Sequence, residues 1–333
     1  MMPSLTIGIP TYNRSACVVQ TVQRLLHNND TDFELVVSDN ASDDDTAARL
    51  GELSDNRLRI IRQSENVGPT ANFSTLLDQA SGDYFILHQD DDVVTSDFLA
   101  AFFALARATP NLELFATSYW RGNPQTGYRG RAFGSLTKRL PALAEPSTPI
   151  VLPGKEIAPL LLLDMPFINP GVAYRTETLR RLGGFGAYPT WGGDIVINTR
   201  MLLQGPFGYV CMPYTVYVEH TTNYSRHVER AKRENWNQRM YQTLVEDLEA
   251  AGVDWPSIAF GELASWPPPE VLVLLRSWLH CRAPASLISL GWKSYREGLK
   301  SGRRSLGRAI RKLGIVGFLR ALQCHRKGLT PVI

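Results

Sequence analysis

Acidic side chains follow the ends of short apolar runs in the first half of this sequence. Asp39-Asn40 follows one such run, and Asp90-Asp91-Asp92 follows another. Three consecutive aspartates repel one another unless a cation or hydrogen-bond donors compensate their charge. Carboxylate oxygens suit Mg²⁺ or Mn²⁺, which combine one or two carboxylates with phosphate oxygens of a substrate. The pattern therefore predicts a divalent metal site that holds a phosphorylated ligand.

These acids also have simpler interpretations. A single aspartate after a strand, such as Asp39, is common in turns. The triplet Asp90–Asp92 can form a solvated turn before the helical pattern that starts near Asp97. The sequence has neither the phosphate loop that ends in Gly-Lys-Ser/Thr nor a G-x-G-x-x-G turn after its first strand, which excludes P-loop NTPases and the usual dinucleotide-binding class. We favour the metal interpretation of the triplet because an apolar strand leads directly into it.

The elements that position these residues alternate along the first half of the chain. Runs rich in β-branched and aromatic residues predict strands at 5–9, 33–38, 58–62, 84–87 and 112–118. Helical periodicity between the runs predicts helices near 16–27, 45–53, 70–80 and 97–108. Such alternation predicts an α/β fold with a mostly parallel, Rossmann-like sheet and flanking helices.

The second half is organised differently. Residues 120–155 are rich in Gly, Pro and basic residues, which predicts a long mobile loop. Strand and helix patterns return from 156 to 225, and helical patterns dominate 226–333. Between Arg282 and Lys327 twelve Lys or Arg stand against one acid. This basic C-terminal extension either lies on an anionic membrane surface or packs on the preceding domain with a solvated face.

The composition predicts an ordinary globular protein. Of the 333 residues 44% are hydrophobic and 20% are charged, and the net charge of +3 does not indicate a nucleic-acid partner. Four scattered cysteines without a C-x-x-C pair fit a reducing compartment. The sequence has neither a signal-peptide pattern nor an apolar run of about 18 residues. We predict a cytoplasmic protein, whose basic extension is the candidate for peripheral contact with the inner face of the membrane.

Several ordered motifs together resemble the inverting family-2 glycosyltransferases of the GT-A fold, of the bacterial type. The similarity covers about residues 4–225 and rests on the segments 7–14, 36–46, 65–73, 81–94, 169–185 and 192–205. It implies a GT-A domain over 1–225, with a nucleotide-binding part at 1–119, the loop at 120–155 and an acceptor part at 156–225. It also implies a UDP-, dTDP- or GDP-linked sugar donor, Mg²⁺ or Mn²⁺, and inversion at the anomeric carbon.

The resemblance assigns roles to individual residues. Asp39 binds the base, Asp92 ligates the metal, and Asp90 or Asp91 lies near the ribose. Asp194 occupies the position of the catalytic base. The other residues that the matching segments place at the nucleotide sugar are Pro10, Thr11, Tyr12, Asn13, Arg14, Asn40, Asn66, Gly68 and Asn72.

Three further positions concern the acceptor and the metal. His220 resembles a late histidine that completes the metal site in some relatives, although a lone histidine after a strand is often structural. Trp191 either offers a flat face to an acceptor sugar or packs in the core. Gly193 stands where the family usually has a glutamate, which removes a group that often helps to position the acceptor.

Asp194 starts a predicted helix, where the dipole and the free amides hold a carboxylate ionised. A plain helix cap is therefore the alternative to a catalytic base. The base role rests on geometry and on the resemblance, and such a base typically contributes about 10²–10⁴-fold to the rate.

The sequence thus predicts a metal-dependent inverting glycosyltransferase in bacterial surface polysaccharide or glycolipid synthesis, with a saccharide or lipid-linked saccharide as acceptor. A non-catalytic nucleotide-sugar-binding protein is one alternative, against which the presence of Asp194 argues. A sugar-phosphate nucleotidyltransferase is the other, and it would carry a Gly-rich basic loop after the first strand, unlike Thr11-Tyr12-Asn13-Arg14.

Overall fold

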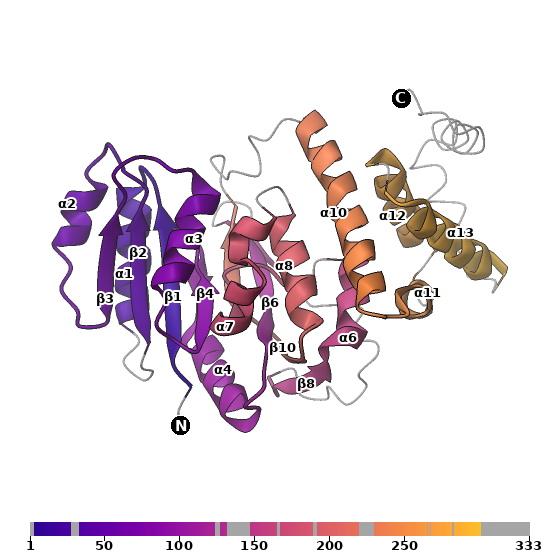
Figure 1. Cartoon of the computed structure of the whole chain (residues 1–333), viewed down its shortest axis with the longest axis horizontal. Helices are drawn as coiled ribbons and strands as arrows, with labels where there is room; N and C mark the ends of the chain where they lie inside the picture. Colours follow the sequence, from indigo (N-terminus) through magenta and orange to yellow (C-terminus); the bar gives the residue numbers. More distant parts are fainter. Residues whose placement is uncertain are drawn as a thin grey trace. The chain divides into compact units, whose positions relative to one another are not determined.

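The computed structural model describes residues 3–27, 33–123, 127–131, 147–164, 167–188, 192–219, 230–264, 266, 268–281 and 283–300. The chain divides into two compact units, Met1–His227 and Val228–Ile333. The first unit carries the sheet, and the described part of the second is helical (Figure 1).

One mixed sheet forms the centre of the first unit. Its strand order in the described residues is β3-β2-β1-β4-β9-β6-β10-β5, with β7 paired to β6 and β8 paired to β10. The strands are β1 Leu5–Thr11, β2 Glu34–Asp39, β3 Leu58–Arg62, β4 Tyr84–Leu87, β5 Val93–Val94, β6 Leu114–Asn123, β7 Gly127–Arg131, β8 Ile150–Pro153, β9 Val172–Arg175 and β10 Pro206–Val218.

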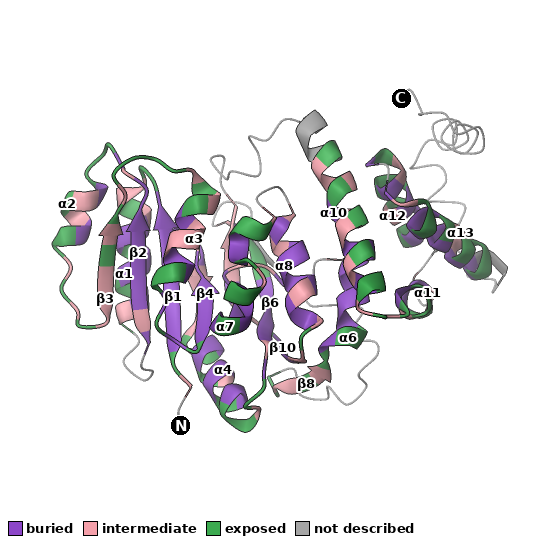
Figure 2. Ribbon diagram, viewed as in Figure 1, coloured by how far each residue is buried: buried purple, intermediate pink, exposed green. Residues whose placement is uncertain are grey.

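The first four strands are parallel to one another, as the sequence predicts. β1 pairs with β2 as far as Thr11 opposite Asp39, and with β4 as far as Gly8 opposite Leu87. Apolar residues on both faces bury β1, β2 and β4 almost completely, whereas β3 at the edge of the sheet is partly exposed (Figure 2). Because these strands share one direction, their carboxyl ends meet at one edge of the sheet.

The rest of the sheet is mixed. Strand β9 pairs antiparallel with β4 on one side and with β6 on the other, and β10 runs parallel to β6. The predicted loop at 120–155 is wrong where the chain is described, because β6 extends to Asn123 and both β7 and β8 are strands. Pairing with β6 and β10 outweighs the Gly and Pro content of the segment. Residues 132–146 lie outside the described ranges.

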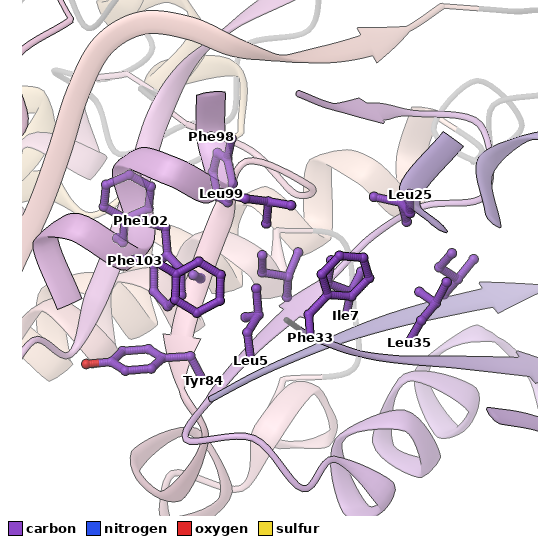
Figure 3. Packing of buried hydrophobic residues seen from close by; sticks show 14 of the residues in the cluster. Leu5, Ile7, Leu25, Phe33, Leu35, Tyr84, Phe98, Leu99, Phe102 and Phe103 are labelled. Atoms are coloured by element: carbon purple, nitrogen blue, oxygen red, sulfur yellow. The ribbon is translucent and has the colours of Figure 1, made fainter. Parts of the chain in front are cut away.

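Two helices, α1 (Ser15–Leu26) and α4 (Ser96–Ala108), cover one face of the parallel strands. Alternate strand residues point to this face, and α1 buries residues three or four positions apart, as an amphipathic helix must. Figure 3 shows the resulting cluster, which includes Leu5, Ile7, Leu25, Phe33, Leu35, Tyr84, Phe98, Leu99, Phe102 and Phe103.

The opposite face of the parallel strands carries α3 (Pro69–Gln79), which contacts β1, β2, α7 and the 3₁₀ segment η2. On β1, Gly8 faces α3, and a Cβ there would lie 2.8 Å from the Phe85 ring. Glycine at this position therefore allows α3 to pack closely. The remaining helical segments of this unit are α2 Thr46–Gly51, α6 Gly154–Ile157, η1 Ala158–Leu162, α7 Thr176–Arg181, η2 Gly184–Ala187 and α8 Gly193–Leu202.

The second unit contains the helices α10 (Arg230–Ala250), α11 (Trp255–Leu263), α12 (Pro268–His280) and α13 (Ala285–Lys300). Helix α13 packs on α11 and α12, and the Lys293 ammonium lies 4.3 Å from the centroid of the Phe260 ring. None of the helices in the described ranges has the length and apolar character that a membrane span requires. The basic extension after Lys300 lies outside those ranges.

Candidate active site

The acidic and amide residues that follow β1, β2 and β4 come together in the structure. Asn40 donates its backbone N–H to the Thr11 carbonyl at 2.9 Å, which joins the ends of β1 and β2. The Thr11 hydroxyl donates to Asp90 Oδ2 at 2.8 Å, which joins the ends of β1 and β4. The predicted gathering of these residues at one edge of the sheet is therefore observed.

Arg14 bridges two aspartates of the triplet. Its Nη1 lies 2.8 Å from Asp90 Oδ1, and its Nη2 lies 2.7 Å from Asp91 Oδ2. Burial alone would lower the pKa of Arg14, but the charges of Asp90 and Asp91 raise that pKa above its ordinary value. The Thr21 hydroxyl on α1 also donates to the Asp90 carbonyl at 2.9 Å. These bonds hold the turn after β4 against α1.

Asp92 has a different environment from its two neighbours. The residue is 2% exposed, and its Oδ1 accepts a hydrogen bond from the Val218 N–H of β10 at 2.9 Å. Within the described ranges it forms no ion pair. Burial raises the pKa of Asp92 well above its ordinary value, and the charges of Asp91 and Asp90 raise it further. A buried carboxylate in this state fits a cation partner.

The carboxylates of the triplet are ligands of the type that Mg²⁺ and Mn²⁺ take. No three His, Cys, Asp or Glu side chains converge on one point in the part of the chain that the structure describes. Mg²⁺ typically binds one or two carboxylates and takes its other ligands from water and substrate phosphates. The buried Asp92 carboxylate beside the acids of the triplet fits that mode, with His220 lying outside the described residues.

His88, which precedes the triplet, contributes no positive charge. Burial lowers its pKa to about 4, and its ring Nδ1 lies 2.7 Å from the Gln89 carbonyl. The imidazole is therefore neutral at physiological pH, and it does not offset the charge of the neighbouring aspartates.

Asp39, at the end of β2, presents one buried oxygen without a hydrogen bond. Its Oδ1 accepts from the Ser42 N–H at 3.0 Å and from the Ser42 hydroxyl. Its Oδ2 is buried and lacks a hydrogen-bond partner among the described residues, although Arg62 Nε approaches to 3.8 Å. A buried acceptor in this position matches an N–H group of a nucleobase.

The asparagines assigned to the nucleotide sugar hold the surrounding loops. Asn40 donates to Asn66 Oδ1 at 2.9 Å and accepts from the Val67 N–H at 3.0 Å. Asn13, which has a positive φ of 52°, accepts from the Asp43 N–H at 2.7 Å. These bonds fix the loops that follow β1, β2 and β3.

Other residues assigned to the nucleotide sugar divide between the core and the surface. Asn72 is buried and exchanges two hydrogen bonds with Ser38, at 2.6 and 3.1 Å, which is a structural role. Pro10 is buried, and Gly68 caps α3 with a φ of 81°. Tyr12, which follows β1, is 40% exposed.

Asp194 lies in the first turn of α8, after Gly192 in a left-handed conformation. Burial raises the pKa of Asp194, against the opposing effect of a hydrogen bond from the Ile195 N–H. The Tyr174 phenol is close enough for the Asp194 charge to raise the pKa of Tyr174, and the phenol is held by Asn169 and Asn198 at 3.1 and 2.8 Å. An aspartate with a raised pKa is a better proton acceptor than an exposed one.

Close packing against Tyr188 requires glycine at position 193 of this chain. A Cβ at this position would lie 2.4 Å from the Tyr188 carbonyl oxygen. The glutamate that the family usually has here therefore does not fit the backbone of this protein. Trp191, which precedes this turn, lies outside the described residues.

The Gly193→Ala variant is expected to lose stability, because α8 must move away from Tyr188 to admit the methyl group. Overpacking of this kind costs about 1–3 kcal/mol. The matched control is Gly51→Ala, since a Cβ at Gly51 has no neighbour within 4 Å. Urea unfolding of both variants measures the difference, and equal midpoints would contradict the steric argument.

Three contacts of the site were not predicted from the sequence. Ser42 holds Asp39, Thr21 holds the backbone of Asp90, and the Val218 N–H holds Asp92. Ser42 lies three residues after Asp39, a spacing typical of an aspartate side chain that accepts from a turn N–H. This contact could therefore have been predicted from the sequence. Val218 contributes a backbone group, which has no signature in the sequence.

Comparison with known proteins identifies a family match within the first unit. Residues 6–157 match the family model described as Glycosyl transferase family 2. The matched segment, called the family 2 segment below, spans less than half of the chain. It holds β1 to β8, and thus the edge of the sheet with Asp39 and Asp90–Asp92.

Two curated relatives of the chain come from bacteria. The chain is 33% identical over 102 residues to a GalNAc(5)-diNAcBac-PP-undecaprenol beta-1,3-glucosyltransferase of Campylobacter jejuni, and these residues are 30% of this chain and 33% of the relative. It is 35% identical over 101 residues to the abequosyltransferase RfbV of Salmonella typhimurium, covering 29% of this chain and 30% of the relative. The matches thus span about a third of each relative's length.

Solved structures share the fold over most of the chain. A mannosyltransferase of Pyrobaculum calidifontis in complex with GDP-Man and Mn²⁺ has 18% identity and a TM-score of 0.50, with 91% of this chain and 88% of that chain covered. TarS of S. aureus in complex with UDP-GlcNAc has 14% identity and a TM-score of 0.53, with 90% and 92% covered. The fold around the family 2 segment is the GT-A fold, as the sequence predicts.

Proposed function

We propose that this chain is a metal-dependent, inverting glycosyltransferase that uses a UDP-, dTDP- or GDP-linked sugar. The observation that carries the proposal is the presence of two buried carboxylates, those of Asp39 and Asp92, at one edge of the sheet. Asp39 Oδ2 has no hydrogen bond among the described residues, and Asp92 lacks an ion pair there. One carboxylate suits the base of a nucleotide, and the other suits the cation that accompanies its diphosphate.

In this proposal different residues act on the two sides of the anomeric carbon, one on the acceptor and the others on the nucleotide. Asp194 accepts the proton of the acceptor hydroxyl, whose oxygen forms the new bond to the anomeric carbon as the bond to the diphosphate oxygen breaks. Asp92 would hold the cation, with His220 as the additional ligand that the resemblance implies. A bound Mg²⁺ or Mn²⁺ neutralises the charge that develops on the leaving diphosphate. Asp39 and Tyr12 orient the nucleoside.

The acceptor in this proposal is a saccharide or lipid-linked saccharide of bacterial surface polysaccharide or glycolipid synthesis. The names of the curated relatives support it, since one includes a PP-undecaprenol-linked saccharide.

The basic residues between Arg282 and Lys327 support a peripheral position at the inner face of the membrane. Flotation of the full chain with anionic vesicles tests that position, and recovery of all the protein at the bottom of the gradient contradicts it.

The test of the proposed function is a titration with UDP, dTDP and GDP in the presence of MnCl₂, followed by hydrolysis assays with sugars linked to the nucleotide that binds. We expect one nucleotide to bind in a Mn²⁺-dependent manner and its sugar conjugate to be hydrolysed slowly. Absence of binding for all three nucleotides would exclude the function. Binding without hydrolysis or transfer would instead favour a non-catalytic nucleotide-sugar-binding protein.

A further inference from the structure

Arg14 is the counter-charge of the acidic triplet in this structure. It contacts Asp90 and Asp91 at 2.8 and 2.7 Å, while Asp92 forms no ion pair in the described part of the chain. We infer that Arg14 makes the binding of a divalent cation at Asp90–Asp92 depend on the nucleoside diphosphate. This inference rests on the proposed function and concerns the order in which its ligands assemble.

The geometry explains why a cation alone binds poorly. Both oxygens of Asp90 already have partners, Arg14 at Oδ1 and the Thr11 hydroxyl at Oδ2. One oxygen of Asp91 is also held by Arg14. A cation that arrives alone must therefore either break these contacts or bind Asp92 with a fixed positive charge nearby. Partial burial strengthens that repulsion, because the side chains of Arg14, Asp90 and Asp91 are 30%, 5% and 12% exposed.

A nucleoside diphosphate removes both obstacles. Its oxygens supply the ligands that the carboxylates cannot, and its charge offsets that of Arg14. A guanidinium group matches phosphate oxygens as well as it matches carboxylates, so Arg14 gains an alternative partner. The cation and the nucleotide therefore bind cooperatively, and each raises the affinity for the other by the same factor.

The test is calorimetric titration of the full chain with MnCl₂, alone and with saturating UDP, dTDP or GDP. In the wild type we expect Mn²⁺ to bind at least about fivefold more tightly when the nucleotide is present. The Arg14→Gln variant should bind Mn²⁺ alone about tenfold more tightly than the wild type, with a smaller effect of the nucleotide. Arg14 makes no side-chain hydrogen bond to cap α1, so the substitution removes the charge without removing a cap.

Two control variants separate the effect of the Arg14 charge from other effects of the substitution. Arg24→Gln removes an exposed arginine from the same helix and should behave like the wild type. Arg14→Lys keeps the positive charge and should bind Mn²⁺ alone as weakly as the wild type. Thermal unfolding of each variant confirms that it is folded.

One result overturns the inference and leaves the proposed function intact, namely an Arg14→Gln variant that binds Mn²⁺ alone no more tightly than the wild type. A wild type whose Mn²⁺ affinity is the same with and without a bound nucleotide overturns the inference and also contradicts the Mn²⁺-dependent nucleotide binding of the proposed function. If none of the three nucleotides binds the wild type, the proposed function and the inference fail together.

Discussion

Asp194→Asn is expected to reduce sugar transfer by about 10²–10⁴-fold while nucleotide binding stays near that of the wild type. Asparagine keeps the shape of the side chain and an oxygen that accepts from the Ile195 N–H, but it cannot take a proton. Initial rates of nucleoside diphosphate release measure transfer, and calorimetry measures binding. The control is Asp97→Asn, which changes an exposed acid in the first turn of α4. Turnover within a few-fold of the wild type would remove Asp194 from the base role.

The pH dependence of transfer follows from the same residue. Burial raises the pKa of Asp194, so the carboxylate becomes available as a base at a higher pH than an exposed aspartate, whose pKa is about 3.9. Transfer should therefore rise as the pH rises through the pKa of Asp194, and the acid limb should lie above the ordinary aspartate range. An acid limb that is the same in Asp194→Asn would belong to another group.

Asp92→Asn is expected to abolish Mn²⁺-dependent nucleotide binding and to stabilise the metal-free protein. The two effects share one cause, which is a buried carboxylate without an ion pair in the described part of the structure. The folded-state pKa of Asp92 is raised, so its contribution to stability is present below the unfolded pKa of about 3.9 and is lost as the pH rises through the folded pKa. Asparagine avoids that loss at neutral pH.

The expected gain for Asp92→Asn is about 1 kcal/mol, which corresponds to a rise of about 2–4 °C in the unfolding midpoint. Differential scanning calorimetry in EDTA measures the midpoint, and titration with MnCl₂ and nucleotide measures binding. Asp78→Asn is the matched control, because Asp78 is exposed on α3. Retained Mn²⁺-dependent binding would exclude Asp92 as a ligand, and a lower midpoint would contradict the account of its burial.

Local patterns were sufficient to predict the parallel part of the sheet, from β1 to β4. The strands at Leu5–Thr11 and Tyr84–Leu87 are short apolar runs, and the helices between strands have clear amphipathic periodicity. Parallel direction follows from the alternation of strands and helices. The shared position of Asp39 and Asp90–Asp92 then follows from the common direction of the strands, without any knowledge of individual contacts.

The second half of the sheet could not be predicted in this way. Strand β9 has four residues and pairs with β4 and β6, which lie on both sides of it in space and far from it in sequence. The ion pairs of Arg14 with Asp90 and Asp91 likewise join positions more than 70 residues apart. The steric role of Gly193 depends on the path of the backbone at Tyr188. Each of these features arises from tertiary packing, which local sequence does not encode.

The hydrogen bond from the Val218 N–H to Asp92 is insensitive to the identity of the side chain at position 218. Asp92 precedes β9 in the chain and Val218 follows it at the end of β10, so the contact joins distant parts of the sequence. Because the donor is a main-chain group, any residue except proline supplies it. Side-chain substitution at position 218 therefore leaves this contact with the acidic triplet in place.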